Sequence, residues 1–364
     1  MSQNKKIKIA FIDDGVNPAF IPENVIFENY IADEFGVYKD EPVTNISHGT
    51  LCYQVFINYI KTEYHLISIK VINSETFRGN HKSMVSALKW CKNQNIDLVN
   101  MSVGTRQFSD FAHIGEVIDD LVDTIIVAAC NNDNDVTFPA CMPNVIGVRH
   151  VDFDILNGNF AYLNNPFDGV NVLTCVKDIP ISYGSHGVFF TSRTNSLATP
   201  VITAKIFNYM VDGLYGLESI KNRLKEESIR DSAFFSYDFY KNILRNWIDI
   251  TVPIIFISNS NCFEIDMLRE LLKIFSDNGY RAIALSNKIE TSITDSLFFL
   301  QPFEKKPLSD VIELYYNFSK SDILFIHHDD TAIPSLSEKL QPDFFLSFND
   351  TPQVLYEEIV KSFP

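Results

Sequence analysis

The sequence has none of the features that mark a membrane, secreted or metal-binding protein. No apolar run among its 364 residues approaches the roughly 20 residues that a membrane-spanning helix needs, so we expect no membrane partner. The opening MSQNKKIKIAFIDD has no long apolar region and no small-residue cleavage site, which predicts the absence of a secretion signal. The six cysteines show no CxxC spacing, which argues against a zinc site and a dense disulfide framework. These absences predict a cytoplasmic location, reduced thiols and no required metal.

Positive charge and glycine-rich phosphate motifs are also scarce. The formal net charge is −16, with a pI near 4.9, whereas nucleic-acid binding needs a basic surface, so we expect no nucleic-acid partner. Neither G-x-x-x-x-G-K-[ST] nor G-x-G-x-x-G occurs, so nucleotide binding has no motif support. We therefore expect no cofactor.

Short apolar segments rich in β-branched residues alternate with helical patterns in the first two thirds of the chain. The pattern of 82–94 predicts a helix, because its apolar positions form an approximate helical stripe. Alternation of strand and helix is typical of an α/β protein with a doubly wound parallel sheet. The predicted strands are 7–12, 65–72, 96–103, 124–130 and 144–151.

The same rhythm begins again near residue 251. We predict a first domain over residues 1–230, a linker over 231–250 and a second, smaller α/β domain over 251–364. The second domain is predicted to be Rossmann-like or flavodoxin-like. It is a candidate for recognising a partner protein or a substrate peptide.

Three polar residues lie where apolar segments end or helices begin. Asp13 ends a predicted strand in IDDG, His48 is followed by glycine and threonine in SHGT, and Ser196 opens a helix in NSLATP. Nucleophilic attack by serine on an amide needs a hydroxyl, a general base and a buried carboxylate that orients the base. Taken singly, the three residues also fit a solvated turn, a capping or packing histidine and a helix N-cap.

Together, these segments resemble those of the subtilisin-like serine peptidases. That family has D-x-G at the end of a strand, H-G-T at the start of a helix, and G-T-S-x-A-T/S-P around the nucleophile. The matching segments here are 13–15, 48–50 and 194–200, with further likeness at 99–104, 127–131 and 138–152.

The resemblance implies a subtilisin-like fold and a serine endopeptidase acting on a peptide or protein. Asp13, His48 and Ser196 would form the catalytic triad, and Asn131 would donate its side-chain amide to the oxyanion. The segment Ser102, Val103 and Gly104 would pair with an extended substrate by strand addition. Short cytosolic relatives with an added C-terminal domain suggest a restricted substrate, such as a precursor peptide.

Two departures from the family pattern lie close to the predicted site. Thr194 and Asn195 replace the usual Gly-Thr, and a threonine in place of glycine predicts strain or narrowing there. This departure leaves open an alternative, a pseudopeptidase that binds peptides without cutting them. Cys130 replaces a glycine, and we expect it to pack in the core.

Several polar clusters have a structural and a functional interpretation. The cluster 131–135 lacks the glycine and distal glutamate of an EF-hand, so we predict no calcium site. We expect 258–262 to be a strand-to-helix loop and 327–330 to be structural, with a nucleotide- or metal-regulated switch in residues 250–364 as a third hypothesis. The first strand begins close to Met1, so we expect either no propeptide or control by another element, such as the second domain.

Overall fold

The computed structural model describes most of the chain and divides it into two compact units. The described residues are 6–73, 78–156, 159–164, 166–182, 188–230, 234, 236–244, 246–257, 265–303, 306–327 and 333–363. The first unit comprises Met1–Thr105, His113–Asn132 and Thr137–Asp231, and the second comprises Arg106–Ala112, Asp133–Val136 and Ser232–Pro364.

The first unit is built on a nine-stranded sheet with the order β10-β11-β9-β8-β7-β1-β4-β2-β3. Its central strands are parallel, and the two outer pairs, β10 with β11 and β2 with β3, are antiparallel. The prediction of an α/β fold with a mostly parallel sheet is confirmed. The strands are β1 (Lys8–Asp13), β2 (Ile26–Ala32), β3 (Val37–Lys39), β4 (His65–Lys70), β7 (Leu98–Met101), β8 (Ile125–Ala129), β9 (Ile146–His150), β10 (Phe160–Tyr162) and β11 (Val172–Thr174).

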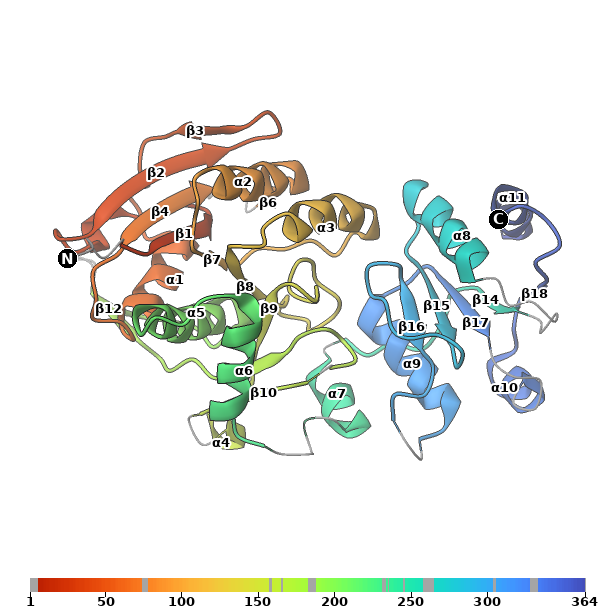
Figure 1. Ribbon diagram of the computed structural model, residues 1–364. Coiled ribbons are helices and arrows are strands. Elements are labelled where there is room, and N and C mark those ends of the chain that lie inside the picture. The colour runs from red at the N-terminus through yellow and green to blue at the C-terminus, as the bar shows by residue number, and fades with distance from the viewer. Residues whose placement is uncertain are drawn as a thin grey trace. The chain divides into compact units, whose positions relative to one another are not determined.

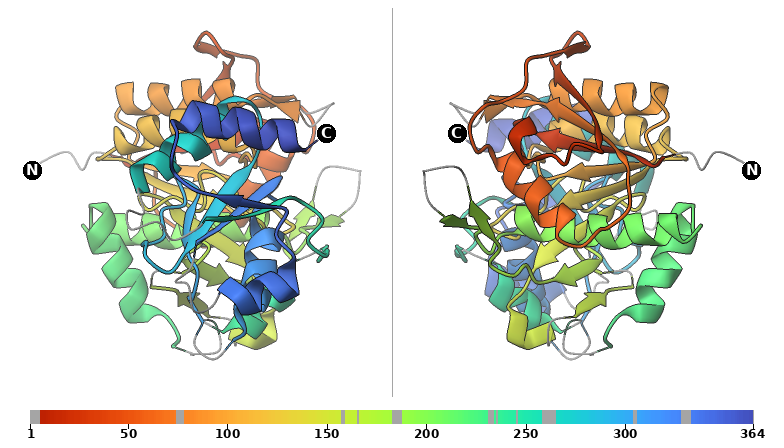
Figure 2. Two further views of the ribbon diagram at one scale, coloured as in Figure 1. Left: turned by 90° about the vertical axis from the view of Figure 1, so that its right-hand side faces the viewer. Right: turned by 90° about the vertical axis from the view of Figure 1, so that its left-hand side faces the viewer.

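Helices cover both faces of this sheet (Figure 1). Helices α1 (His48–Ile57) and α5 (Asn195–Val211) pack on one face, while α2 (His81–Asn93) and α3 (Phe111–Asp119) lie along the other. The side views in Figure 2 show the same layering. Phe56 of α1 contacts Phe11 of β1 and Phe207 of α5 edge to face, which joins the two helices to the sheet through a buried aromatic cluster.

The order of the central strands brings three polar segments to one edge of the sheet. β7, β1 and β4 run parallel, with Ile12 opposite Met101 and Asp13 opposite Lys70. β8 pairs in parallel with β7. The carboxyl ends of β1, β7 and β8 therefore meet at the same edge, where ligands of α/β proteins bind.

Shorter elements complete the first unit. They are η1 (Pro18–Phe20), β5 (Ile72–Asn73), β6 (Arg78–Gly79), α4 (Phe153–Leu156), β12 (Pro180–Ser182), β13 (Val188–Phe190) and α6 (Leu217–Glu227). A second short helix, η2 (Phe108–Asp110), immediately precedes α3 and belongs to the second unit.

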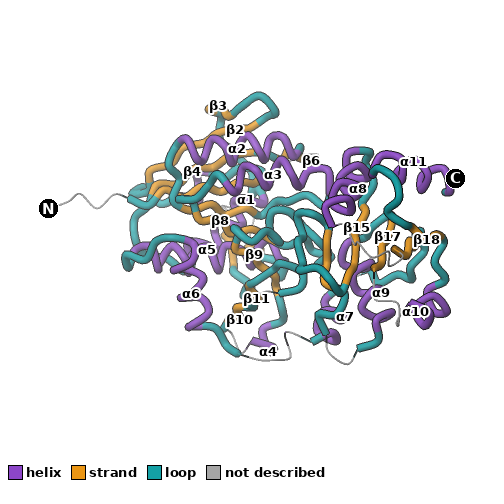
Figure 3. Tube along the Cα trace, turned by 45° about the vertical axis from the view of Figure 1, so that its right-hand side comes forward, coloured by secondary structure: helices purple, strands orange, loops and turns teal. Residues whose placement is uncertain are grey.

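The second unit contains a five-stranded parallel sheet with the order β16-β15-β17-β14-β18. Helices α8 and α11 cover one face, and α9 and α10 cover the other (Figure 3). The strands are β14 (Ile254–Ile257), β15 (Ala282–Ser286), β16 (Leu297–Phe299), β17 (Ile323–His327) and β18 (Phe344–Leu346). The helices are α7 (Tyr237–Ile243), α8 (Ile265–Asp277), α9 (Leu308–Ser319), α10 (Ile333–Leu340) and α11 (Pro352–Ser362).

Two properties of the described part of the chain concern membrane-spanning helices and disulfide bonds. None of its helices is long and apolar enough to traverse a bilayer. The five cysteines within it, Cys52, Cys91, Cys130, Cys141 and Cys175, are buried and form no disulfide.

Candidate active site

Asp13, His48 and Ser196 form a continuous hydrogen-bonded chain. The His48 Nδ1 atom lies 3.0 and 2.9 Å from the two carboxylate oxygens of Asp13, and Nε2 lies 2.9 Å from Ser196 Oγ. The Asp13 side chain is 2% exposed, whereas that of His48 is 33% exposed. A proton on Nδ1 is thus donated to a buried carboxylate, and Nε2 is left to accept the hydroxyl proton of Ser196.

The approach of α1 to the end of β1 explains the glycine that follows His48. A Cβ atom at Gly49 would lie 2.5 Å from the Gly15 carbonyl oxygen and 3.1 Å from the Asp13 Cβ, so a larger residue would push the helix away. Gly15 itself has a φ of +105°, a conformation that favours glycine. These two glycines allow His48 to lie within hydrogen-bonding distance of Asp13.

Asp14 and Ser47 fix the first turn of α1. The Asp14 carboxylate accepts hydrogen bonds from the backbone N–H groups of His48, at 3.1 Å, and Gly49, at 2.7 Å. Ser47 is the N-cap, and its hydroxyl accepts from the Thr50 N–H at 3.1 Å. These three hydrogen bonds fix the position of the helix end that carries His48.

Thr194 lies in an unstrained conformation before the nucleophile. Its φ of −130° and ψ of 161° are in the extended region that any residue adopts, so the strain predicted for a threonine here is wrong. The Thr194 hydroxyl caps α5 by accepting from the Leu197 N–H at 3.4 Å. The same hydroxyl lies 3.1 Å from Ser196 Oγ.

Asn195 connects the nucleophile to two neighbouring segments. Its side-chain Nδ2 donates to the backbone carbonyl of Asn131, and its Oδ1 accepts from the His150 N–H at 2.7 Å. Its own N–H donates to Asn132 Oδ1 at 3.1 Å. Asn195 is buried, so the segment after β8 is tied to the residue that directly precedes Ser196.

Asn131 and the segment 102–104 lie at the predicted sheet edge. Asn131 follows β8, and its N–H donates to Thr137 Oγ1 at 3.0 Å. Ser102, Val103 and Gly104 follow β7; the first two are partly buried and Gly104 is exposed. The next residue, Thr105, exchanges two backbone hydrogen bonds of 2.9 Å with Phe138. The segment thus connects the carboxyl end of β7 to the backbone pair formed by Thr105 and Phe138.

Comparison with known protein families decides which family this arrangement belongs to. Residues 4–206 match the family described as the Subtilase family, and this match covers more than half of the 364 residues. The chain belongs to the subtilase family.

The similarity of this subtilase to individual proteins is distant. Subtilisin amylosacchariticus of Bacillus subtilis subsp. amylosacchariticus is 24% identical over 215 residues, which cover 53% of this chain and 52% of that protein. The Subtilisin of Bacillus pumilus is also 24% identical over 215 residues, covering 53% of this chain and 73% of that protein. The chain therefore spans about half the length of the first of these relatives. A solved structure described as a cold adapted subtilisin-like serine proteinase has a TM-score of 0.45 and 19% identity, covering 60% of this chain and 81% of that one.

A buried thiol, Cys52, lies beneath the triad of this subtilase and was not predicted from the sequence. Its Sγ is 3.8 Å from His48 Nδ1, 3.3 Å from Ser102 Oγ and 3.6 Å from the Ser196 carbonyl oxygen. Ser102 Oγ also donates to the Ser196 carbonyl at 3.0 Å. The signal was available, because Cys52 lies four residues after His48 and therefore on the same face of α1.

Electrostatics favour the protonated form of His48. The Cys52 sulfur and the Asp13 carboxylate both raise the pKa of His48 above its usual 6.5. Burial raises the pKa of the Cys52 thiol, which keeps the thiol neutral at ordinary pH. We therefore attribute the raised pKa of His48 to Asp13.

The donor atoms of Asp13, His48 and Cys52 lie within 4.8 Å of one another, a grouping that could hold a metal ion. However, His48 Nδ1 is hydrogen-bonded to both oxygens of Asp13, and metal binding would have to break these bonds and deprotonate the thiol. The absence of a required metal stays a prediction.

The other predicted polar clusters are divided between the units: Asn131 and Asn132 belong to the first unit, and Asp133–Asp135 and His327 to the second. Arg106 Nη1 binds Asp133 at 3.3 Å and Asp135 at 3.2 Å, so these two carboxylates of the 131–135 cluster already have a cation. His327 Nδ1 lies 2.8 Å from Ser286 Oγ, and both side chains are buried at the carboxyl ends of β17 and β15. Residues 258–262 and 328–330 lie outside the described residues.

Proposed function

We propose that this subtilase is a serine endopeptidase in which Ser196 attacks the substrate carbonyl. The observation that carries the proposal is the pair of bonds made by His48, at 2.9 Å to Ser196 Oγ and at 2.9 and 3.0 Å to Asp13. In this geometry Nε2 can remove the hydroxyl proton of Ser196, while the hydrogen bond from Nδ1 to Asp13 holds the imidazole in a single tautomer.

The reaction proceeds through an acyl-enzyme. As Ser196 Oγ bonds to the carbonyl carbon, its proton moves to His48 Nε2, and the carbonyl oxygen becomes an oxyanion. Asn131 and the Ser196 N–H would stabilise that charge. His48 then gives its proton to the leaving amine as the C–N bond breaks, and it activates a water molecule that releases the acyl group.

The segment Ser102–Gly104 is proposed to bind the substrate as an added strand. It is exposed to solvent to differing degrees, and Ser102 bonds directly to the carbonyl of Ser196. A peptide paired with this segment would pass next to the nucleophile. The restriction of cleavage to a small set of peptides, such as precursor peptides, and the cytoplasmic location remain predictions.

A fluorophosphonate probe tests the proposal directly. We expect the full chain to be labelled at one serine, Ser196, because the probe reports a nucleophilic hydroxyl activated by a base. Intact-mass and peptide mass spectrometry would locate the adduct, and Ser196→Ala is expected to abolish it. Ser228→Ala, at the partly exposed C-terminal end of α6, is the matched control that should retain labelling. Absence of labelling at every pH between about 5 and 10 would favour the alternative, a pseudopeptidase that binds peptides without cutting them.

The pH dependence of kcat/KM follows from the raised pKa of His48. His48 acts as a base only when it is neutral, so kcat/KM should fall as the pH drops through this raised pKa. We expect the acidic limb of the profile to have its midpoint above pH 6.5. Initial rates with a peptide substrate between pH 5 and 10 would measure it.

The variant Cys52→Val tests the attribution of the raised pKa of His48 to Asp13. If the thiol is neutral, the midpoint should stay within a few tenths of a unit of the original value. A large downward shift would show that a thiolate contributes, and a midpoint below 6.5 in the unmodified protein would contradict the prediction.

A further inference from the structure

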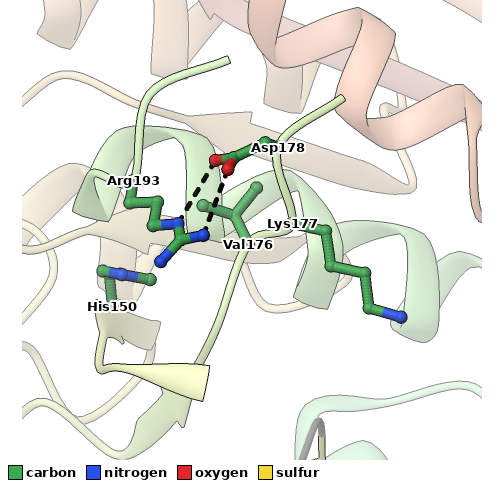
Figure 4. A pocket seen from close by; sticks show the side chains of 5 residues that line it. All are labelled: His150, Val176, Lys177, Asp178 and Arg193. Carbon is green, nitrogen blue, oxygen red and sulfur yellow. Dashed lines mark hydrogen bonds and ion pairs between the residues drawn. The ribbon is translucent and has the colours of Figure 1, made fainter. Parts of the chain in front are cut away.

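A pocket of about 250 Å³ is lined by Arg193, three residues before Ser196, and by no residue of the triad. Figure 4 shows its five lining residues, His150, Val176, Lys177, Asp178 and Arg193. Binding sites for drug-sized molecules usually occupy roughly 300–1,000 Å³. This volume therefore suits a single side chain better than a cofactor.

One connection along the chain and one hydrogen bond place the pocket near the scissile bond. Arg193 precedes Ser196 by three residues, a span of at most about 10 Å for an extended chain. The His150 N–H donates to Asn195 Oδ1 at 2.7 Å, which joins the pocket wall to the residue before Ser196. A peptide bound at Ser196 would therefore carry a neighbouring side chain within reach of this pocket.

The orientation of Arg193 is fixed by Asp178. Arg193 Nε donates to Asp178 Oδ1 at 3.2 Å, and Nη2 donates to Oδ2 at 3.1 Å. Both side chains are about half exposed, at 57% and 46%, and pairs of this kind add little to stability. In Figure 4 the guanidinium lies between the His150 ring and the Asp178 carboxylate, while the Lys177 ammonium points away from them.

The pocket is locally cationic although the chain as a whole is acidic. Lys177 and Arg193 carry two positive charges against the one negative charge of Asp178, whereas the net charge of the chain is −16. The same positive charges affect the buried neighbour Cys175. Burial raises the pKa of its thiol, whereas the charges of Lys177 and Arg193 lower that pKa. Val176 and the His150 ring add apolar surface suited to methylene groups.

We propose that this pocket is a specificity subsite that binds an acidic side chain of the peptide substrate, with Arg193 as its principal recognition group. The proposal rests on the peptidase function proposed above. A guanidinium matches the planar, two-oxygen geometry of a carboxylate, and the apolar walls would pack against the methylene groups of glutamate or aspartate. The subsite would act within about three residues of the scissile bond.

Matched pairs of quenched fluorescent peptides test this subsite on the full chain. Each pair differs only by Glu or Gln, placed in turn at each of the three positions on either side of the scissile bond. We expect the Glu peptide to have at least about tenfold higher kcat/KM at one position, because a charge-assisted bond is lost in the Gln peptide. In Arg193→Met this ratio should fall to about one, and in Asp178→Asn it should rise.

The control variant is Arg269→Met, which removes an exposed arginine that is also paired with an aspartate, Asp266, in the second unit. It should leave the Glu/Gln ratio unchanged, and melting curves would show that each variant is folded. Equal rates for every Glu/Gln pair, or a ratio unchanged in Arg193→Met, would overturn the subsite.

Binding to Ser196→Ala separates failure of the subsite from failure of the peptidase function. Fluorescence anisotropy with the same peptides gives their Kd values without turnover. Tighter binding of the Glu peptide that is lost in Ser196→Ala/Arg193→Met supports the subsite even if the chain cleaves nothing. Equal Kd values for Glu and Gln peptides would refute it, whether or not the fluorophosphonate labels Ser196.

Discussion

Replacing Asp13 with asparagine is expected to lower kcat by about 10⁴, the loss that this change causes in the triad of a serine protease. Asparagine has nearly the same shape as aspartate, but its amide can donate a hydrogen bond to His48 Nδ1. That bond would move the imidazole proton to Nε2, the atom 2.9 Å from Ser196 Oγ. Nε2 could then no longer accept the hydroxyl proton.

The pH profile of this variant provides a second readout. Because Asp13 is the charge to which we attribute the raised pKa of His48, its loss should move the midpoint of the acidic limb downward. Residual rates and their pH dependence would be measured with one peptide substrate over a long incubation. Asp40→Asn, which alters a partly buried carboxylate paired with Lys70 at 2.8 Å, should keep kcat nearly unchanged. A loss of less than about tenfold in Asp13→Asn would contradict the assigned role.

The central strands were predictable because each is a short apolar run that ends in polar or glycine residues. The strand β2 was not predicted, since IFENYIA mixes polar and apolar residues near the edge of the sheet and none of its residues except Ala32 is buried. In the second unit, β17 lies between β14 and β15, although β14 and β15 are consecutive along the chain. Such an order depends on long-range pairing and cannot be read from local periodicity.

The residues of the candidate site also divide into those that the sequence predicts and those whose contacts only the folded chain reveals. Asp13, His48 and Ser196 lie in recognisable motifs. The glycine that follows His48 has a direct steric reason, because a Cβ atom at Gly49 would lie 2.5 Å from the Gly15 carbonyl oxygen. The effect of Thr194 was misjudged because the family's glycine suggested an unusual backbone, whereas the observed φ is −130°. The contacts of Asn195 with Asn131 and of Cys52 with Ser102 join segments far apart in the sequence, so only the folded chain reveals them. The position of Cys52 beside His48, in contrast, follows from their spacing of four residues in one helix.

The second large effect is expected for Asn131→Ala, which should lower kcat by about 10²–10³, the range measured when a subtilisin loses its oxyanion-hole asparagine. The backbone of Asn131 is held by Asn195, and its N–H donates to Thr137, so the loss of the side chain should leave the segment in place. The oxyanion forms only in the transition state, so KM should change much less than kcat. Asn195→Ala, which frees this segment but removes no donor to the oxyanion, should cause a smaller loss.

Steady-state kinetics with one peptide substrate would distinguish these outcomes. Asn208→Ala is the matched control, because Asn208 lies in the same helix as Ser196 and its Nδ2 donates to the Tyr59 carbonyl at an exposed position. Fluorophosphonate labelling should also slow in Asn131→Ala, since the phosphonyl oxygen occupies the place of the oxyanion. If kcat were unchanged in Asn131→Ala but reduced in Asn195→Ala, the backbone that Asn195 holds, and not the Asn131 amide, would be the source of the stabilisation.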